Sequence, residues 1–350
     1  MPGDTDAPRE ASQSKPTIRD VAELAGVHPS TVSRVLNGDD SRAIAPTREK
    51  IRNAAATLGW RPNSIARSLS LGRSYAIGMS IPLFSYPPHA SMIFGAERAA
   101  EDRGNILVVT DSSDSEERLQ SQLLRMSDRV DGFIVASVSI SSPTVSVLEQ
   151  ARIPFVLLNR RAAGSHRSVI GNDEYGVRLA AEHLRSLGHR SVAYFGVNDE
   201  IDTAQRRHAA FHSMCIELGM TLDDGNVMRM ATAQEDVEPR LALMLFGEPS
   251  AAPTAIFADN LFTAANVLTA VKKLGLRVPE DVSVIGFDNA PIAAHLWVPL
   301  TAVQMPNEEL GATAVESLLH LLAGGEGEME LVVPTLPSLV LRESTSPPRA

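Results

Sequence analysis

The sequence has almost no cysteine and no long apolar run. Cys215 is the one cysteine in 350 residues, so no disulfide can form within the chain. It lies beside Met214 and Ile216 in a helical pattern, which predicts a small buried apolar side chain. No stretch of about 18 consecutive apolar residues occurs, so we expect no transmembrane helix.

The first sixteen residues also lack the pattern of an export signal. MPGDTDAPREASQSKP is polar and proline-rich, whereas a signal peptide is basic and then apolar. Mixed charge without apolar periodicity predicts a disordered extension over residues 1–16. We expect a soluble, cytoplasmic protein.

Several catalytic signatures are missing as well. There is no GxGxxG after the first strand-like run, no GxxxxGK[ST] and no GxSxG, which disfavours dehydrogenases, NTPases and hydrolases. His208 and His212 lie four residues apart in a helical stretch, a spacing that can hold a metal, but no HExxH accompanies them. We expect no enzyme activity, no cofactor and no metal. A Rossmann-type enzyme is the alternative that a search for bound dinucleotide would test.

The most informative stretch runs from Thr17 to Gly38 and predicts two short helices joined by a tight turn. Thr17 is followed three residues later by Asp20, a capping-box spacing. Gly26 should end the first helix because glycine tolerates the left-handed conformation. Pro29 suits the first turn of the second helix, which should end at Asn37 and Gly38.

The second helix has two different faces. Val32, Val35 and Leu36 form an apolar face, and a polar stripe is made by Ser30, Ser33, Arg34 and Asn37. A polar stripe on a short helix is usually a solvated face, so the stripe alone does not decide between solvent and DNA. A third helix over residues 47–58 should complete a small core, with basic residues on its outer side.

Charge is divided unevenly along the chain, whose net charge is −10. Residues 17–74 carry nine Lys and Arg against five Asp and Glu, whereas residues 75–350 carry 21 against 34. The acidic part should repel nucleic acid, which confines DNA contact to the first 74 residues.

Four ordered segments, DVAELAGV, TVSRVLNG, TREKI and LGWRPN, resemble the DNA-binding domain of the lactose-repressor (LacI/GalR) family of bacterial transcription regulators. The resemblance covers about residues 17–343. It implies a helix-turn-helix headpiece over 17–61, then a hinge helix and linker over 62–74. The DNA contacts that it implies are Thr17, His28, Pro29, Ser30, Thr31, Ser33, Arg34, Asn37, Asn63, Ala66, Arg67 and Leu69.

Leu69 has a special role in this resemblance, which implies that it wedges into the minor groove when the hinge folds on DNA. Apolar side chains that unstack a base step are an established minor-groove device. Residues 64–71 are too few to hold a helix alone, so bracing by DNA and a partner chain is needed. The alternative is that Leu69 packs on its own domain.

The headpiece departs from the family at two helix starts. His28 and Ile44 stand where a serine is usual. Isoleucine cannot cap a helix, and His28 should cap weakly or contact a phosphate when protonated.

From Tyr75 onward, apolar runs alternate with amphipathic helices: AIGMSIP, ILVVTDS, GFIVAS, PFVLLNR, SVAYFGV, TAIFADN and VSVIGFD. This βαβ alternation predicts an α/β fold with parallel sheets covered on both faces. The resemblance implies a periplasmic-binding-protein fold of two Rossmann-like subdomains, at about 75–172 with 303–331 and about 173–302 with 332–343. Residues 344–350 should form a tail.

Candidate ligand groups lie at strand ends, where parallel sheets usually bind small molecules. The resemblance implies effector contacts at Tyr86, Asn159, Thr203, Arg207, Asn260 and Asp288. Asn159 replaces an aspartate often found there, and an amide both donates and accepts. The match is weak around Tyr86 and Asn260. Asp288 could instead cap a turn, Arg207 could be an ordinary exposed helix residue, and the two could pair with each other.

These observations predict a homodimeric repressor that binds a palindromic double-stranded operator under control of a small polar effector, such as a sugar or sugar derivative. We expect a dimer and not a tetramer because LRESTSPPRA, after the last strand, has no leucine heptads. The alternatives are a nucleoside-type corepressor on the same fold, or a ligand-binding protein without DNA regulation.

Overall fold

The computed structural model describes residues 16–36, 43–60, 72–113, 115–231, 235–247, 252–325 and 329–349. The chain divides into two compact units, Met1–Ser74 and Tyr75–Ala350. The predicted hinge helix and five of the predicted DNA contacts lie outside the described residues: Asn37, Asn63, Ala66, Arg67 and Leu69.

The described residues of the first unit form three helices, α1 (Ile18–Ala25), α2 (Pro29–Leu36) and α3 (Ala45–Leu58). The predicted capping box is confirmed, since the Thr17 amide donates to Asp20 Oδ2 at 2.6 Å and the Asp20 amide donates to Thr17 Oγ1 at 3.4 Å. Gly26 ends α1 with a φ of 66°, in the left-handed region that the sequence predicted.

One apolar cluster holds these three helices together. Val21, Val32 and Ile51, one from each helix, are buried side by side. Helix α3 begins at Ala45, two residues before the predicted start at 47. Its N-cap Ile44 makes no side-chain hydrogen bond, which confirms that isoleucine leaves this helix uncapped.

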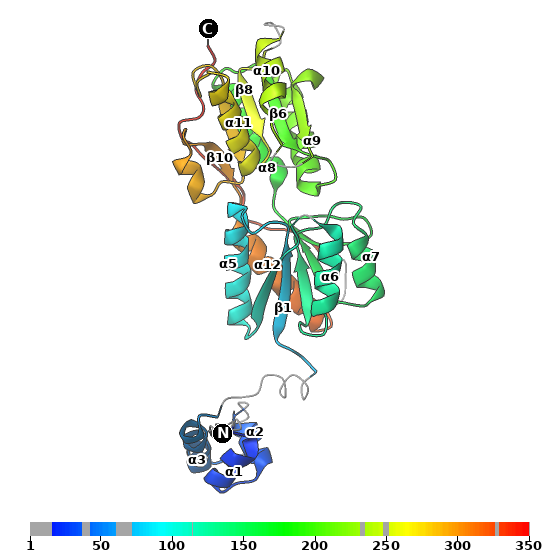
Figure 1. Ribbon diagram of the computed structural model, residues 1–350, viewed down its shortest axis with the longest axis vertical. Helices are drawn as coiled ribbons and strands as arrows, with labels where there is room; N and C mark the ends of the chain where they lie inside the picture. The colour runs from blue at the N-terminus through cyan, green and yellow to red at the C-terminus, as the bar shows by residue number, and fades with distance from the viewer. Residues whose placement is uncertain are drawn as a thin grey trace, which may run out of the picture. The chain divides into compact units, whose positions relative to one another are not determined.

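The first sheet of the second unit, in which Figure 1 labels β1, has the strand order β11-β5-β4-β3-β1-β2, and every pairing among these strands is parallel. Its strands are β1 (Ala76–Ile81), β2 (Ile106–Asp111), β3 (Gly132–Val135), β4 (Phe155–Leu158), β5 (Arg167–Ile170) and β11 (Met329–Val332). Helices α5 (Pro87–Asp102) and α12 (Asn307–Leu322) pack on one face, and α6 (Glu116–Met126) and α7 (Pro143–Gln150) on the other.

The second sheet has the order β12-β10-β9-β8-β6-β7, with only β12 antiparallel among the described strands. Its strands are β6 (Val192–Val197), β7 (Val227–Met230), β8 (Ala255–Ala258), β9 (Ser283–Phe287), β10 (Thr301–Gln304) and β12 (Ser338–Val340). Helices α8 (Asp173–Ser186) and α9 (Asp202–Leu218) cover one face, and α10 (Glu238–Phe246) and α11 (Leu261–Lys273) the other. Short 3₁₀ turns lie at Asp224–Asn226 and Pro291–His295.

Burial follows the predicted pattern of strands covered on both faces. β3, β4, β8 and β9 are buried along their whole length. Cys215 is buried as predicted, and desolvation raises the pKa of its thiol to about 12, so it remains an unreactive apolar group. None of the described helices is both long and apolar enough to cross a membrane.

The structure corrects the boundaries expected at the end of the chain. β10 belongs to the second sheet through Gln304, so the chain returns to the first subdomain after 304 rather than after 302. β11 stays in the first sheet through Val332, one residue further than expected. Residues 344–346, assigned to a tail, are hydrogen-bonded into the second subdomain. The buried Ser344 hydroxyl donates to the Val284 carbonyl at 2.6 Å and accepts from the Thr301 amide at 2.8 Å.

Two glycines let α5 and α12 touch through their backbones. A Cβ at Gly95 would lie 1.9 Å from the Glu308 carbonyl oxygen, and a Cβ at Gly311 would lie 2.0 Å from the Met92 carbonyl oxygen. Neither helix can retreat without opening the apolar cluster below it. The contact therefore fixes the position of α5, whose N-cap residue is Tyr86.

Gly95→Ala should lower the free energy of unfolding by about 1–3 kcal/mol or more, because the added methyl overlaps backbone that cannot move aside. Urea unfolding of the full chain measures the change. Gly225→Ala is the control, since a Cβ there meets nothing within 4 Å and the backbone is not left-handed. Equal stabilities for the two variants would contradict the close contact.

Candidate functional site

A cleft of about 670 Å³ opens in the second unit and is lined by residues of both subdomains. Its walls come from the carboxyl ends of strands in both sheets, including the residues that follow β4, β8 and β9. Parallel sheets present ligand sites at this edge. The structure brings all six predicted effector residues to this cleft: Tyr86, Asn159, Thr203, Arg207, Asn260 and Asp288.

Arg207 occupies the floor of the cleft and is almost fully committed to protein acceptors. Its Nε donates to Asp173 Oδ1 at 2.6 Å, and Nη1 and Nη2 donate to the two oxygens of Asp288 at 2.9 and 3.0 Å. Nη1 also donates to the Asp259 carbonyl at 2.7 Å. A guanidinium has five N–H groups. One N–H on Nη2 therefore remains without an acceptor among the described residues.

The surroundings of Arg207 keep it charged and fixed. Asp288 and Asp173 raise the pKa of Arg207 well above its ordinary value against the opposing effect of burial. The guanidinium also lies over the Phe287 ring, 3.9 Å from its centroid. The structure therefore shows Arg207 and Asp288 paired with each other, which was one of the alternatives for these residues. Because Arg207 is only 3% exposed, it is not an ordinary exposed helix residue.

This pairing changes what an alanine at position 207 would do. Removal of the guanidinium leaves Asp173 with Arg206 alone and leaves Asp288 with only the Tyr86 hydroxyl, and loss of one member of a buried ion pair typically costs about 3–5 kcal/mol. Arg207→Ala should therefore destabilise the floor of the cleft as well as change ligand binding. Asp288→Asn is the milder change, because Arg207 keeps Asp173.

Tyr86 reaches the same network from the first subdomain. Its hydroxyl donates to Asp288 Oδ2 at 2.9 Å and accepts from the Leu261 amide at 3.3 Å. Its ring meets Phe262 edge-on, with centroids 5.0 Å apart. Burial raises the pKa of Tyr86 well above its ordinary value, so the phenol keeps its proton and remains a donor. A single hydroxyl thus joins α5 to the end of β9.

Asn159 and Asp288 end the central strands β4 and β9 in the left-handed region, with φ of 53° and 64°. Asparagine and aspartate tolerate this conformation better than other residues with a side chain. Both residues line the cleft. Each subdomain therefore places a short polar side chain at the end of a central strand, and both residues adopt the same left-handed backbone conformation.

Asn260 has a structural role that was not predicted from the sequence. Its side-chain oxygen accepts from the Thr263 amide at 2.9 Å and caps α11, while its Nδ2 donates to Asp259 Oδ1 at 2.7 Å. Both ends of the amide are engaged, so Asn260 shapes the wall of the cleft and has little left to offer a ligand.

Sequence reasoning missed Arg160 and Asp259, which also line the cleft. Arg160 Nη1 donates to the Asn159 carbonyl and to Thr203 Oγ1, both at 2.9 Å. The pair Arg160-Arg161 after a strand end was the available signal. Asp259 directly follows β8, and its position beside Asn260 was the signal there.

Asp259 is a buried carboxyl held by three donors. Oδ2 accepts from the Tyr194 hydroxyl and from the Val197 amide, both at 3.2 Å, and Oδ1 accepts from Asn260. Burial outweighs these hydrogen bonds and raises the pKa of Asp259 to about 6.

In the first unit, the ring of His28 caps the start of helix α2. His28 Nδ1 accepts from the Ser30 amide at 3.2 Å and lies 2.8 Å from the Ser30 hydroxyl. His28 therefore caps α2 through a ring nitrogen, which was one of the two roles expected for it. Arg34 and Ser30 are exposed on α2, with Val32 and Val35 buried on the opposite side. Thr17 is engaged in the capping box of α1.

Comparison with known proteins identifies the family. Residues 17–63 match bacterial regulatory proteins of the lacI family, and residues 181–345 match a periplasmic binding protein-like domain. The chain is 31% identical over 339 residues to the HTH-type transcriptional repressor PurR of Aliivibrio fischeri. The matched region covers 94% of this chain and 98% of that protein. The chain belongs to the LacI family of bacterial regulatory proteins.

Other LacI-family members agree. The ribose operon repressor of Escherichia coli (strain K12) is 30% identical, over 87% of this chain and 92% of that protein. A structure of the lac repressor dimer bound to operator and the anti-inducer ONPF has a TM-score of 0.81 at 28% identity, over 95% of this chain and 100% of that chain. The CelR–cellobiose complex has a TM-score of 0.69 at 28% identity, over 94% and 99%. The two-sheet fold and the DNA-binding regulator predicted from the sequence are confirmed, and the curated relatives are repressors rather than enzymes.

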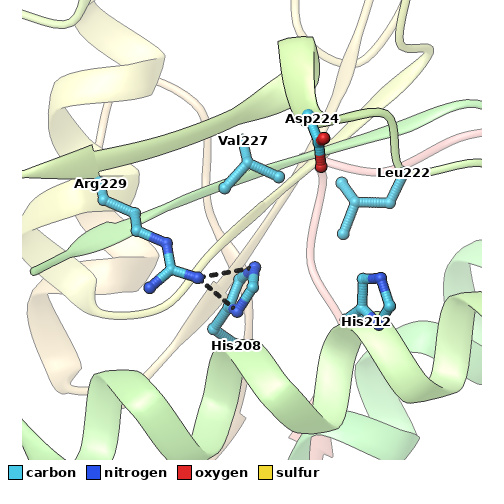
Figure 2. A pocket seen from close by; sticks show the side chains of 6 residues that line it. All are labelled: His208, His212, Leu222, Asp224, Val227 and Arg229. Carbon is cyan, nitrogen blue, oxygen red and sulfur yellow. Dashed lines mark hydrogen bonds between the residues drawn. The ribbon is translucent and has the colours of Figure 1, made fainter. Parts of the chain in front are cut away.

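A second pocket of this LacI-family chain, about 450 Å³, lies beside α9 and contains the histidine pair (Figure 2). Arg229 Nη2 lies 2.7 Å from His208 Nδ1, and Arg229 is also paired with Asp199. His208 packs edge-on against Tyr194, and burial lowers its pKa. Within the described part of the chain no group of three His, Cys, Asp or Glu side chains is placed to hold a metal ion.

Asp259 predicts a distinctive pH dependence of stability. Its pKa is raised from 3.8 to about 6, so the stability that it contributes is fully present below pH 4 and is lost as pH rises through 6. Asp259→Asn does not titrate, so between pH 4 and pH 7 its unfolding free energy should gain about 2–3 kcal/mol relative to wild type.

Urea unfolding at pH 4, 5, 6 and 7 measures this difference. Asp281→Asn is the control, because the pKa of Asp281 is shifted in the opposite direction from that of Asp259. Hydrogen bonds from Arg277 lower it to about 2. Stability from Asp281 is present above pH 4 and lost as pH falls through 2, so the difference between Asp281→Asn and wild type should stay nearly constant from pH 4 to pH 7. A flat difference for Asp259→Asn would refute the raised pKa.

Proposed function

We propose that this protein is a cytoplasmic, homodimeric repressor that binds a palindromic operator. A small polar effector in the cleft controls its affinity for that operator. The supporting observation is the cleft itself, which collects the predicted effector residues from two subdomains at the carboxyl ends of their strands. The relatives supply the biological setting. One structure is a lac repressor dimer bound to operator, and another is a CelR complex with cellobiose.

A hydroxyl-rich ligand matches the polar groups of the cleft. Asp288 accepts hydrogen bonds, Thr203 both donates and accepts, and Asn159 offers an amide whose Oδ1 is buried without a partner among the described residues. A sugar or sugar derivative presents several hydroxyls that fit such a set. A nucleoside-type ligand is the second candidate, because the edge-on rings of Tyr86 and Phe262 provide an aromatic wall in the same cleft.

The bridge from Tyr86 to Asp288 gives the ligand a way to act. A hydroxyl of the ligand can take the place of the Tyr86 phenol on Asp288, and the contact between the two subdomains then changes. A ligand shifts a conformational equilibrium only when its affinity differs between the two arrangements. A ligand that contacts both walls can bind the two arrangements with different affinities, because the walls come from different subdomains.

DNA recognition is assigned to the exposed face of α2, with Pro29 and Ser30 at the start of the helix and Arg34 one turn later. Thr31 and Ser33 are half-buried on the flanks of this face. A two-fold dimer presents two such helices to two half-sites, which is why the operator should be palindromic. Leu69 remains a prediction from the sequence, with the operator bend as its readout.

Arg34→Ala should weaken binding to the specific operator by about 1–3 kcal/mol and leave non-specific, salt-dependent binding largely in place, because a bidentate arginine–base contact carries sequence information. Fluorescence anisotropy on operator and random duplexes at two salt concentrations measures both. Arg48→Ala, on α3, is the comparison arginine. If Arg34→Ala lost equal affinity on both duplexes, its contact would be to phosphate instead.

Asp288→Asn should abolish or strongly reduce the effect of ligand on operator affinity, measured against the ligand-free affinity of the same variant. The amide cannot accept at both positions that now face Arg207 and Tyr86. The ligand comes from a thermal-shift screen of sugars, sugar phosphates and nucleosides, and operator complexes are then titrated with it. Asp224→Asn, in the second pocket, is the matched control. A normal ligand response in Asp288→Asn would refute this cleft as the effector site.

A further inference from the structure

Arg160 differs from Arg206 and Arg207, which form ion pairs with a cluster of three carboxylates, Asp173, Asp202 and Asp288. Arg206 pairs with Asp173 and Asp202, and Arg207 pairs with Asp173 and Asp288. The three carboxylates of the cluster are therefore all held by Arg206 and Arg207. No described carboxylate lies within ion-pair distance of Arg160.

The hydrogen bonds of Arg160 leave one edge of its guanidinium open. Both hydrogen bonds that Arg160 donates to described residues come from Nη1, to the Asn159 carbonyl and to Thr203 Oγ1. Nε is buried without an acceptor, and Nη2 donates to no residue in the described ranges. Nε–H and Nη2–H point the same way from the planar group and form the fork that binds carboxylate or phosphate through two parallel hydrogen bonds.

An open edge of this kind is costly in a buried place. Desolvation lowers the pKa of Arg160, and the positive charge of Arg207 lowers it further. A water molecule would satisfy a hydrogen bond but would not supply the missing counter-charge. An anion placed at the edge supplies both.

The other carboxylates of the cleft are already engaged elsewhere. Glu116 Oε1 accepts from the Ser142 hydroxyl and the Thr144 amide at the start of α7. Glu200 Oε2 accepts from the Ser141 hydroxyl at 2.8 Å, and Asp259 is held by its three donors. None of these groups reaches the free edge of Arg160.

We propose that Arg160 binds an anionic group of the effector, a phosphate or a carboxylate, through its Nε–Nη2 edge. This inference rests on the proposed function, in which the effector occupies the cleft. Asn159 Oδ1, buried and without a described partner next to Arg160, accepts a hydrogen bond from an adjacent hydroxyl of the same ligand. The effector class is therefore a hydroxyl-rich anion, such as a sugar phosphate or a sugar acid, rather than a neutral sugar.

The position of Arg160 also ties the anion to the second subdomain. Arg160 follows β4 of the first subdomain, and its Nη1 already donates to Thr203 on α9 of the second. An anion that fixes the guanidinium plane holds this contact across the cleft in place. The charged end of the effector thus acts on the contact between subdomains and not only on affinity.

Matched probes test the charge preference on the full chain at constant ionic strength. The probes are glucose, glucose 6-phosphate and gluconate, then ribose, ribose 5-phosphate and ribonate, with inorganic phosphate as the minimal anion. Thermal shift and calorimetric titration measure binding. At least one anionic member should bind about tenfold or more tightly than its neutral partner, as expected for charge-assisted hydrogen bonds. The phosphate and carboxylate arms distinguish the two kinds of anion.

Three variants assign the preference to Arg160. Arg160→Gln should remove it, and Arg160→Lys should lose most of it, because an ammonium keeps the charge but not the fork. Arg161→Gln is the matched control, since Arg161 pairs with Glu330 instead. Without ligand, Arg160→Gln should melt at or above the wild-type temperature, whereas a purely structural arginine would lower the melting temperature when lost.

The outcomes separate this inference from the proposed function. If neutral probes bind as tightly as the anions, if no anionic probe binds wild type, or if Arg160→Gln keeps the preference, the assignment of Arg160 is overturned. The effector cleft still stands in the case where a neutral ligand changes operator affinity and Asp288→Asn abolishes that change. Failure of every ligand to affect operator binding would instead count against the proposed function.

Discussion

Arg207 joins more of the second subdomain than any other charged side chain described above. Its hydrogen bonds reach the first turn of α8, the residue after β8 and the residue after β9, and its plane lies on Phe287. Each bond is between buried groups, where a charge without a partner costs several kcal/mol. The strand ends that form the floor of the cleft are consequently held in one arrangement, and the second subdomain offers the ligand a preformed surface.

The first subdomain contributes a different kind of surface. Tyr86 crosses to Asp288 with one hydrogen bond, Arg160 crosses to Thr203 with another, and the buried Asn159 Oδ1 has no partner among the residues that the structure describes. These are few and exchangeable contacts, each worth about 0.5–3 kcal/mol. A ligand that replaces them can alter the balance between two subdomain arrangements, which usually requires only a few kcal/mol. The cleft thus combines a rigid floor with a wall that is free to respond.

Much of this was readable in the sequence, and the exceptions have physical causes. The long apolar runs identified the buried strands, and Thr17 with Asp20 identified the cap of α1, because both signals are local. β5, β7 and β10 were not recognised, because Arg167, Arg229 and Gln304 interrupt or flank their short apolar runs. The six cleft residues came from the family resemblance, but their partners did not. Whether Arg207 faces a ligand or an aspartate depends on Asp173 and Asp288, which lie 34 and 81 positions away. The open edge of Arg160 depends on the same distant pairing.

The left-handed backbone at Asn159 and Asp288 has a consequence for how such a cleft can diversify during evolution. Most side chains are strained at these two strand ends, so substitution there is largely limited to asparagine, aspartate and glycine. Residues around them, such as Arg160 or Thr203, carry no such backbone restriction and are free to vary with the ligand. Homologues that recognise different small molecules should therefore keep asparagine, aspartate or glycine at these two positions, and should draw their chemical variety from the neighbouring positions.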